Sequence, residues 1–150
     1  MKARLLVVDD EVEIREMLSR HFRFDDYEVH TATNGARAIE VMRREKIDVV
    51  ISDIMMPEMD GITLLRLLRD EYPMVHTILI TGYVHQGNLL AGIRHGAFNC
   101  IFKPLHDMTE LEQSVSAAVL ATNRWYRKLC ELHEMKPEDE LRPACAPDGN

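Results

Sequence analysis

The sequence predicts an α/β protein with a doubly wound, five-stranded parallel sheet and helices on both faces. Apolar runs alternate with amphipathic stretches along residues 4–122, which is the pattern of successive βα units. The first and third runs are continuously apolar, as in strands that are buried on both faces. The expected strands are residues 4–8, 27–32, 48–52, 76–81 and 98–102.

Helices are expected between these strands because apolar residues recur there at intervals of three and four. Asp60 precedes the third such stretch and is suited to capping the helix, while Gly61 eases the tight entry into it. Residues 86–95 form the weakest of the expected helices, since their two glycines lower helix propensity.

Three carboxylates follow the first and third strands. Asp9 and Asp10 come directly after one run, and Asp53 comes directly after the other. In open α/β sheets, ligands bind beyond the carboxyl ends of the strands, so these acids should lie together. Their charges would repel one another unless a cation joined them, and Mg²⁺ prefers oxygen ligands. The sequence therefore predicts a Mg²⁺-dependent site for phosphate chemistry.

Two further side chains are expected at the same edge of the sheet. Thr81 ends the fourth strand and Lys103 follows the fifth. A hydroxyl and an ammonium placed there can bind the oxygens of a phosphoryl group and offset its charge. Either residue alone would be unremarkable at a strand end, but the set of five polar residues on four strands indicates a functional site.

The composition sets the limits of function. The chain has 150 residues, 46% of them hydrophobic, which is enough for a packed core. A net charge of −7 argues against general nucleic-acid binding, which needs a basic surface. The sequence predicts neither a membrane span nor a signal peptide. Its three cysteines lack the spacing of metal ligands, so we expect reduced thiols and a cytoplasmic location.

At this point the chain resembles a known family, the receiver domain of bacterial two-component response regulators. The resemblance covers roughly residues 3–122 and implies a flavodoxin-like sheet of strand order 2-1-3-4-5. The matching motifs are Asp9-Asp10-Glu11, the stretch from Asp53 to Gly61, Thr81-Gly82 and Lys103-Pro104.

The resemblance implies a role for each matching residue. Asp53 is similar to the phosphoacceptor of the family. Asp10, Asp53 and the backbone carbonyl of Met55 are similar to the direct Mg²⁺ ligands, and Asp9 to a residue that reaches the ion through water. Thr81 and Lys103 are similar to the groups that hold the phosphoryl oxygens, and the bond before Pro104 to the family's cis peptide.

The chemistry that follows is a switch. A carboxylate can attack phosphorus, and phosphoryl transfer requires mainly alignment and charge stabilisation. We expect the donor to be a phosphohistidine on a histidine kinase or a phosphotransfer protein. The chain would promote only its own phosphorylation and dephosphorylation, so we do not expect an enzyme acting on an external substrate. The kinase, the signal and the downstream protein are not indicated by the sequence.

One residue departs from the family pattern. An aromatic ring is usual three residues before the lysine and turns inward when the domain is phosphorylated, but this chain has Cys100 there. Tyr83, Phe98 or Phe102 could take over part of that role, or the two phenylalanines could simply pack on the sheet.

Three other functions compete with this interpretation. A haloacid-dehalogenase-like phosphohydrolase would need a second aspartate two residues after Asp53, where this chain has Met55. A pseudo-receiver that is never phosphorylated would agree with Cys100 but not with the complete set of five site residues. A flavodoxin-like redox carrier would have to bind a flavin phosphate among three acids.

The last expected helix, from about residue 107 to residue 134, would be about 42 Å long, so its end should protrude. Its apolar residues have heptad-type spacing. Either this seam forms a coiled-coil homodimer or a signalling helix, or the helix folds back onto its own domain. The seam consists of Leu111, Val115, Ala118, Thr122, Trp125, Leu129 and Leu132.

The sequence therefore divides into three parts. We expect a receiver domain over residues 1–122, a protruding helix end over 123–136 and a flexible acidic tail over 137–150. No output domain is expected within the chain, and we expect no contact with nucleic acid or membrane through it. The chain is then either a stand-alone receiver or the first part of a longer regulator.

Overall fold

A computed structural model describes residues 2–82 and 85–135 of the chain. Five strands and five helices alternate along it, and the strands form one parallel sheet in the order β2-β1-β3-β4-β5. This confirms the predicted fold class and strand order. The strands are β1 (Arg4–Val8), β2 (Glu28–Ala32), β3 (Val49–Asp53), β4 (His76–Thr81) and β5 (Asn99–Phe102).

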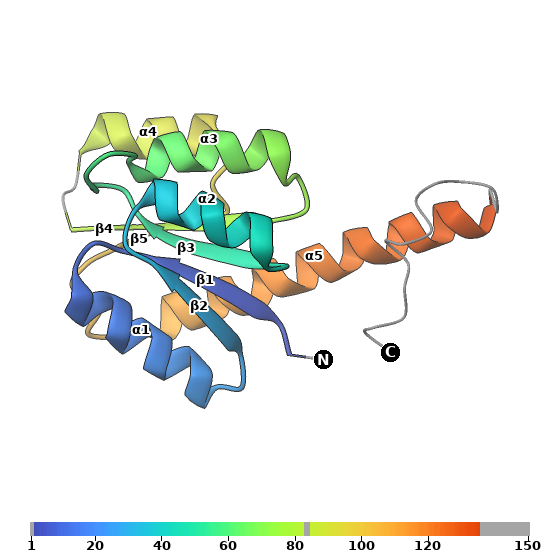
Figure 1. Ribbon diagram of the computed structural model, residues 1–150, viewed down its shortest axis with the longest axis horizontal. Coiled ribbons are helices and arrows are strands. Elements are labelled where there is room, and N and C mark those ends of the chain that lie inside the picture. Colours follow the sequence, from blue (N-terminus) through green and yellow to red (C-terminus); the bar gives the residue numbers. More distant parts are fainter. Residues whose placement is uncertain (1, 83–84, 136–150) are drawn as a thin grey trace.

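The helices form a layer on each face of the sheet (Figure 1). One face is covered by α1 and α5 and the other by α2, α3 and α4, which explains the two main hydrophobic clusters of the core. The helices are α1 (Val12–Phe24), α2 (Gly35–Arg44), α3 (Gly61–Glu71), α4 (Gln86–Arg94) and α5 (Thr109–Met135). Among residues 2–82 and 85–135, no helix is long and apolar enough to cross a membrane.

The start of α3 lies directly against the end of β3. The Asp60 side chain caps the helix by accepting a hydrogen bond of 2.8 Å from the Thr63 N–H, as the sequence predicted. At the next residue, Gly61, a Cβ atom would come within 2.2 Å of the carbonyl oxygen of Asp53. Only glycine allows this close approach, which packs the start of α3 against the backbone of Asp53.

The predicted helix over residues 86–95 is present as α4, but it packs less deeply than its neighbour on the same face. In α3 three leucines are buried, whereas the only buried residue of α4 is Gly92. The side chains of Leu90 and Ile93 are largely exposed. The two glycines therefore weaken the helix without preventing it, and α4 has little apolar burial to hold it on the sheet.

The seam of α5 divides into two parts. Its first four residues, ending at Thr122, are buried against the sheet, so that part of the seam belongs to the core of the domain. Trp125 is 56% exposed, and the helix continues beyond the sheet as a single rod (Figure 1). The expectation that the helix lies on its own domain thus applies to the first half, and the expectation that it protrudes applies to the second half.

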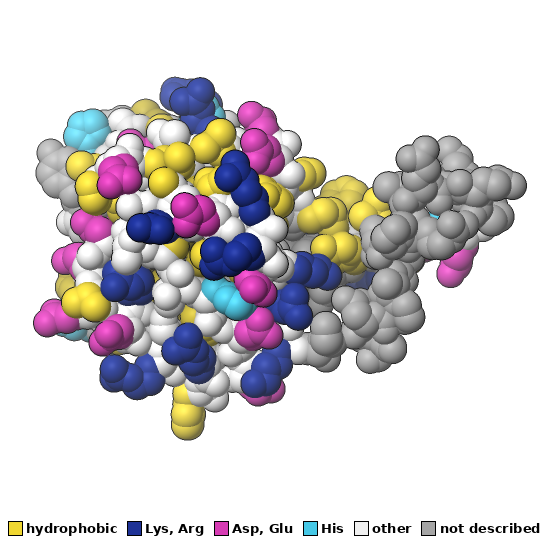
Figure 2. Space-filling model, in the orientation of Figure 1, with side chains coloured by type: hydrophobic (Ala, Val, Ile, Leu, Met, Phe, Trp, Pro, Cys, Tyr) yellow, Lys and Arg dark blue, Asp and Glu magenta, His cyan; other side chains and the backbone are white. Residues whose placement is uncertain are grey.

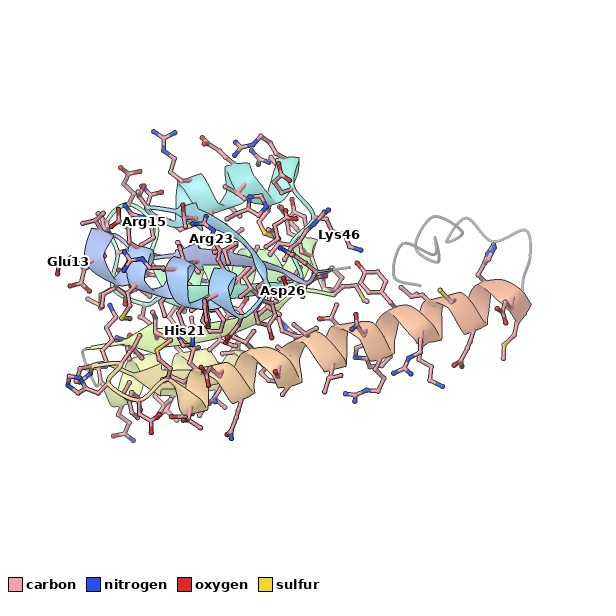
Figure 3. All side chains as sticks on the ribbon, turned by 90° about the horizontal axis from the view of Figure 1, so that it is seen from below. Glu13, Arg15, His21, Arg23, Asp26 and Lys46 are labelled. Carbon is pink, nitrogen blue, oxygen red and sulfur yellow. The ribbon has the colours of Figure 1, made fainter. Side chains whose placement is uncertain are left out.

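Two contacts hold α5 where it leaves the sheet. The Thr122 hydroxyl donates a hydrogen bond of 3.2 Å to the carbonyl of Met74, and Lys46 Nζ lies 4.5 Å from the centre of the Tyr126 ring. Figure 3 shows Lys46 beside this part of the helix. A threonine in the seam therefore serves the packing of the domain. The predicted tail, residues 137–150, lies outside the described residues.

Candidate functional site

The register of the sheet brings the predicted site residues to one edge. Val8 pairs with Ser52, so the residues that follow them, Asp9 and Asp53, stand side by side at the carboxyl ends of β1 and β3. Asp53 itself pairs with Ile80 on β4, and Thr81 is the next residue. Parallel topology thus assembles residues that are far apart in the chain.

The three acids form a compact cluster. One carboxylate oxygen from each of Asp9, Asp10 and Asp53 lies within 4.8 Å of the others. Asp9 is fully buried and Asp53 is 5% exposed, whereas Asp10 is exposed to solvent. The cluster therefore has a buried floor and one side that is open to water.

Burial makes the charges of the two inner acids costly. It raises the pKa of Asp9 above its ordinary value, although the Glu11 N–H and Lys103 oppose this effect. Burial also raises the pKa of Asp53, and the negative charge of Asp9 raises it further. Two buried carboxylates so close together repel one another, so a bound cation would be favourable here.

Lys103 reaches into the same cluster. Its Nζ lies 2.8 Å from Glu11 Oε1, 3.2 Å from Asp9 Oδ2 and 3.3 Å from Asp53 Oδ2. Burial alone would lower the pKa of this ammonium, but the Glu11 hydrogen bond and the charges of Asp53 and Asp9 raise it above its usual value. Lys103 therefore stays charged, and it offsets only part of the negative charge around it.

The donor set fits a hard divalent cation. Asp9 Oδ2 is buried and has no hydrogen-bond partner among the described residues, although it is ion-paired with Lys103. A buried carboxylate oxygen left in this state has capacity for a further cation. Together with oxygens from Asp10 and Asp53 it forms an all-oxygen, net-negative set, which is the set that Mg²⁺ prefers.

The other two predicted residues lie next to this cluster. Thr81 is buried at the end of β4, and its carbonyl accepts a hydrogen bond of 2.8 Å from the Lys103 N–H. Met55 lies in the loop after β3, where its N–H donates to Asp53 Oδ1 at 3.4 Å. The peptide bond between Lys103 and Pro104 is cis, as the resemblance implied.

Glu11 is a site residue for which the sequence indicated no role. It directly follows the two aspartates and is the N-cap residue of α1, so its position alone indicates only the start of a helix. Its side chain instead contacts Lys103, which is 92 residues away in the chain. The sequence indicates Glu11 only as the third acid of the motif Asp9-Asp10-Glu11, without a role for it.

The position that departs from the family pattern is half-buried. Cys100 packs beside Ile54, Leu65 and Leu79, and burial raises the pKa of its thiol. A hollow of about 250 Å³ lies next to it, between β5 and α4. Phe98 and Phe102 are both well exposed, so neither ring occupies the core, and Tyr83 lies outside the described residues.

Comparison with known proteins agrees with this geometry. The family model described as "Response regulator receiver domain" matches residues 5–116. Regulatory protein AtoC from Escherichia coli K12 is 37% identical over 131 residues, which cover 87% of this chain and 28% of AtoC. The chain spans between about a quarter and two fifths of the length of the curated relatives that it matches.

Solved structures show the same fold. A CheY-like receiver domain protein from Methanospirillum hungatei superposes with a TM-score of 0.78 at 25% identity, over 83% of this chain and 98% of that one. The response regulator TrrA from Thermotoga maritima, in complex with Mg²⁺-BeF, has a TM-score of 0.70 at 34% identity, over 79% and 99% of the two chains.

Proposed function

This chain belongs to the response regulator receiver domain family, and from that premise we propose that it is a switch controlled by phosphorylation of Asp53. The observation that carries the proposal is the meeting of two buried aspartates, one exposed aspartate and one lysine at the carboxyl edge of the sheet. The donor is a phosphohistidine on a histidine kinase or a phosphotransfer protein, and the location is the cytoplasm.

The proposed transfer is a displacement at phosphorus. A carboxylate oxygen of Asp53 forms a bond to phosphorus while the bond from phosphorus to the donor's imidazole nitrogen breaks, and that nitrogen keeps the electron pair. Raising of the Asp53 pKa by burial and by Asp9 makes its carboxylate a better base and nucleophile once the proton is gone. In dephosphorylation a water oxygen forms a bond to phosphorus, the bond from phosphorus to the Asp53 oxygen breaks, and Asp53 leaves as a carboxylate.

The remaining residues hold the group that is transferred. Asp9, Asp10 and Asp53, with the carbonyl of Met55, would bind Mg²⁺, which when bound neutralises phosphoryl oxygens and aligns them with Asp53. Lys103 is close enough to Asp53 to pair with a phosphoryl oxygen there. Thr81, at the adjacent strand end, supplies a hydroxyl for hydrogen bonding.

The proposed reaction is confined to the chain itself. Asp53 is consumed in accepting the group and is restored by hydrolysis, so the protein is a switch and not an enzyme with an external substrate. Its output is a change in contacts with a downstream protein. The net charge of −7 gives no support to binding of nucleic acid by this chain.

Mass measurement after incubation with acetyl phosphate and Mg²⁺ tests the proposal. We expect the intact protein to gain one phosphoryl group, which alkali removes, and Asp53→Asn to gain none. The control is Asp70→Asn, which makes the same change at an exposed position on α3 and should be labelled like the wild type. Labelling of Asp53→Asn would remove Asp53 from its role, and an unlabelled wild type would favour a pure interaction module.

A second part of the proposal concerns the free half of α5. Trp125 continues the stripe of Leu111, Val115, Ala118 and Thr122 beyond the sheet, at the same heptad spacing. Figure 2 shows hydrophobic side chains gathered where this helix leaves the globular part. The occupant that fits such a continued stripe is the same stripe of a second copy, so we propose a parallel homodimer.

Sedimentation with and without beryllofluoride tests the dimer. Trp125→Lys should shift the protein towards monomer, because it places a charge in the proposed seam. Leu120→Lys is the matched control, since Leu120 is 65% exposed on the same helix but lies off the stripe. Equal sedimentation of the wild type and Trp125→Lys would reject the dimer while leaving the phosphorylation proposal intact.

A further inference from the structure

The nearest anion to Lys103 is neither of the buried aspartates. Glu11 Oε1 lies 2.8 Å from Lys103 Nζ, whereas the contacts to Asp9 and Asp53 are 3.2 and 3.3 Å long. The Glu11 side chain is 60% exposed, and the Lys103 side chain is only 11% exposed. The ammonium therefore lies at the rim of the acid cluster, with Glu11 on its solvent side.

This position matters because two cations have to share one set of acids. Lys103 is paired with Asp9 Oδ2 and Asp53 Oδ2, and both carboxylates also belong to the set that fits a divalent cation. An ammonium centred among these acids would repel an incoming dication and occupy its ligands. An acid outside the cluster that draws the ammonium towards itself reduces this competition.

We propose that Glu11 is a positioning residue that anchors Lys103 at the rim and so keeps the three aspartates available to the divalent cation. The inference rests on the proposed function, because it takes Mg²⁺ as that cation. Glu11 acts through Lys103, so the ion pair needs both the negative charge and the reach of the side chain. Losing the contact therefore weakens Mg²⁺ binding even when the charge remains.

The backbone is arranged to hold Glu11 in this place. Its N–H donates a hydrogen bond of 2.8 Å to Asp9 Oδ1, and its carbonyl accepts one of 3.0 Å from the Arg15 N–H. The Arg15 guanidinium in turn donates to the carbonyl of Asp9 at 2.7 Å. These bonds do not involve the Glu11 side chain, so its substitution should leave the loop and the start of α1 intact.

Two substitutions separate contact from charge. Glu11→Gln removes the charge, and Glu11→Asp keeps it but shortens the side chain by one methylene, so that it no longer reaches Lys103. The control is Glu13→Gln, which removes the same charge from an exposed residue in the first turn of α1 (Figure 3). Circular dichroism and thermal unfolding show whether each variant is folded.

Calorimetric titration with Mg²⁺ is the measurement. An ion pair with one largely exposed partner is weak, so we expect Glu11→Gln and Glu11→Asp each to raise the dissociation constant about 2- to 5-fold. Glu13→Gln should change it less than about 2-fold. If Glu11→Asp binds Mg²⁺ as the wild type does, only the charge matters and the inference is overturned. Unchanged binding by both Glu11 variants overturns it as well.

Repeating the titration with Lys103→Met variants tests whether Glu11 affects Mg²⁺ binding through Lys103. Without Lys103 the Glu11 side chain has no ammonium to position, so Lys103→Met and the double variant with Glu11→Asp should bind Mg²⁺ equally. The effects of Lys103→Met and Glu11→Asp on the dissociation constant should therefore be non-additive. An effect of Glu11→Asp that persists without Lys103 would reject the positioning role. A wild type that binds no Mg²⁺ would overturn the proposed function, whereas bound Mg²⁺ with unaffected Glu11 variants would overturn only this inference.

Discussion

The two edges of the sheet each contain a titratable side chain with a buried polar atom, but with opposite electrostatics. At the carboxyl edge, Asp9 Oδ2 has no hydrogen bond among the described residues, and burial raises the pKa of Asp9. At the amino edge, His76 Nε2 likewise has none, and burial lowers the pKa of His76. In both places burial favours the neutral side chain.

The neighbours explain why Asp9 and His76 differ in their response to a positive charge. Around Asp9 the other acids outnumber Lys103, so the carboxyl edge remains negative. At His76 the positive charges of Arg69 and Arg124 lower its pKa further. The acid cluster thus gains from a divalent cation, whereas the surroundings of His76 disfavour even a proton on its ring.

The acid cluster and the projecting half of α5 lie at opposite edges of the sheet. The α5 helix leaves the domain at the amino edge, because Thr122 is bonded to Met74 just before β4 and Tyr126 lies over Lys46 just before β3. The acid cluster lies at the other end of the strands. A signal from Asp53 to the free half of α5 would have to cross the length of the sheet.

The largest difference between the edges should appear when Mg²⁺ is added. A ligand at 100 times its dissociation constant that binds only the folded state stabilises it by about 2.7 kcal/mol. We expect urea unfolding of the wild type to show such a shift and Asp10→Ala to lose most of it, because Asp10 offers an exposed ligand oxygen. Asp70→Ala is the control, and an undiminished shift in Asp10→Ala would place the ion elsewhere.

A smaller effect is expected where α5 leaves the amino edge. Thr122→Val keeps the volume but removes the hydroxyl that binds the Met74 carbonyl, which should cost about 1 kcal/mol of unfolding free energy. Equilibrium unfolding measures it, and Mg²⁺ binding should not change. Thr31→Val makes the same substitution at an exposed position on β2. If both variants unfold alike, the hydrogen bond does not hold the helix.

The smallest effect should be the pH dependence caused by His76, because this side chain keeps some contact with solvent. Its pKa is lowered in the folded protein, so below the ordinary value of 6.5 the unfolded chain binds the proton first. The contribution of His76 is therefore complete above that pH and is lost as the pH falls below it.

Comparing urea unfolding at two pH values, one above and one below 6.5, measures this contribution. His76→Gln should lose less stability than the wild type on acidification, since the groups common to both proteins cancel in the difference. The control is His106→Gln, at an exposed histidine. A wild type and a His76→Gln variant with the same pH dependence would contradict the prediction.

Much of the fold could be predicted because it is encoded in local patterns. The continuous apolar run before Asp53 predicted a buried strand, and β3 differs from it by one residue at each end. Asp60 was recognised as an N-cap because its side chain bonds to a residue only three positions away. The meeting of Asp9 with Asp53 also followed from the sequence, since parallel strands place their carboxyl ends at one edge.

The role of α5 could be predicted only in part. Its periodicity predicted a long helix with a continuous apolar stripe, and this helix is present. The periodicity is the same in both halves, however, so it could not show that Val115 faces the core while Trp125 lies in solvent. That difference depends on where the sheet ends, which is a property of the packed domain.

The sequence by itself determined the order of strands and helices and the edge at which the acids meet, because spacing and polarity act over a few residues and parallel pairing follows from them. Only the tertiary structure decided that Asp9 is buried while Asp10 is exposed, and that Glu11 holds Lys103. These features depend on packing and on a contact across 92 residues, which no local pattern records.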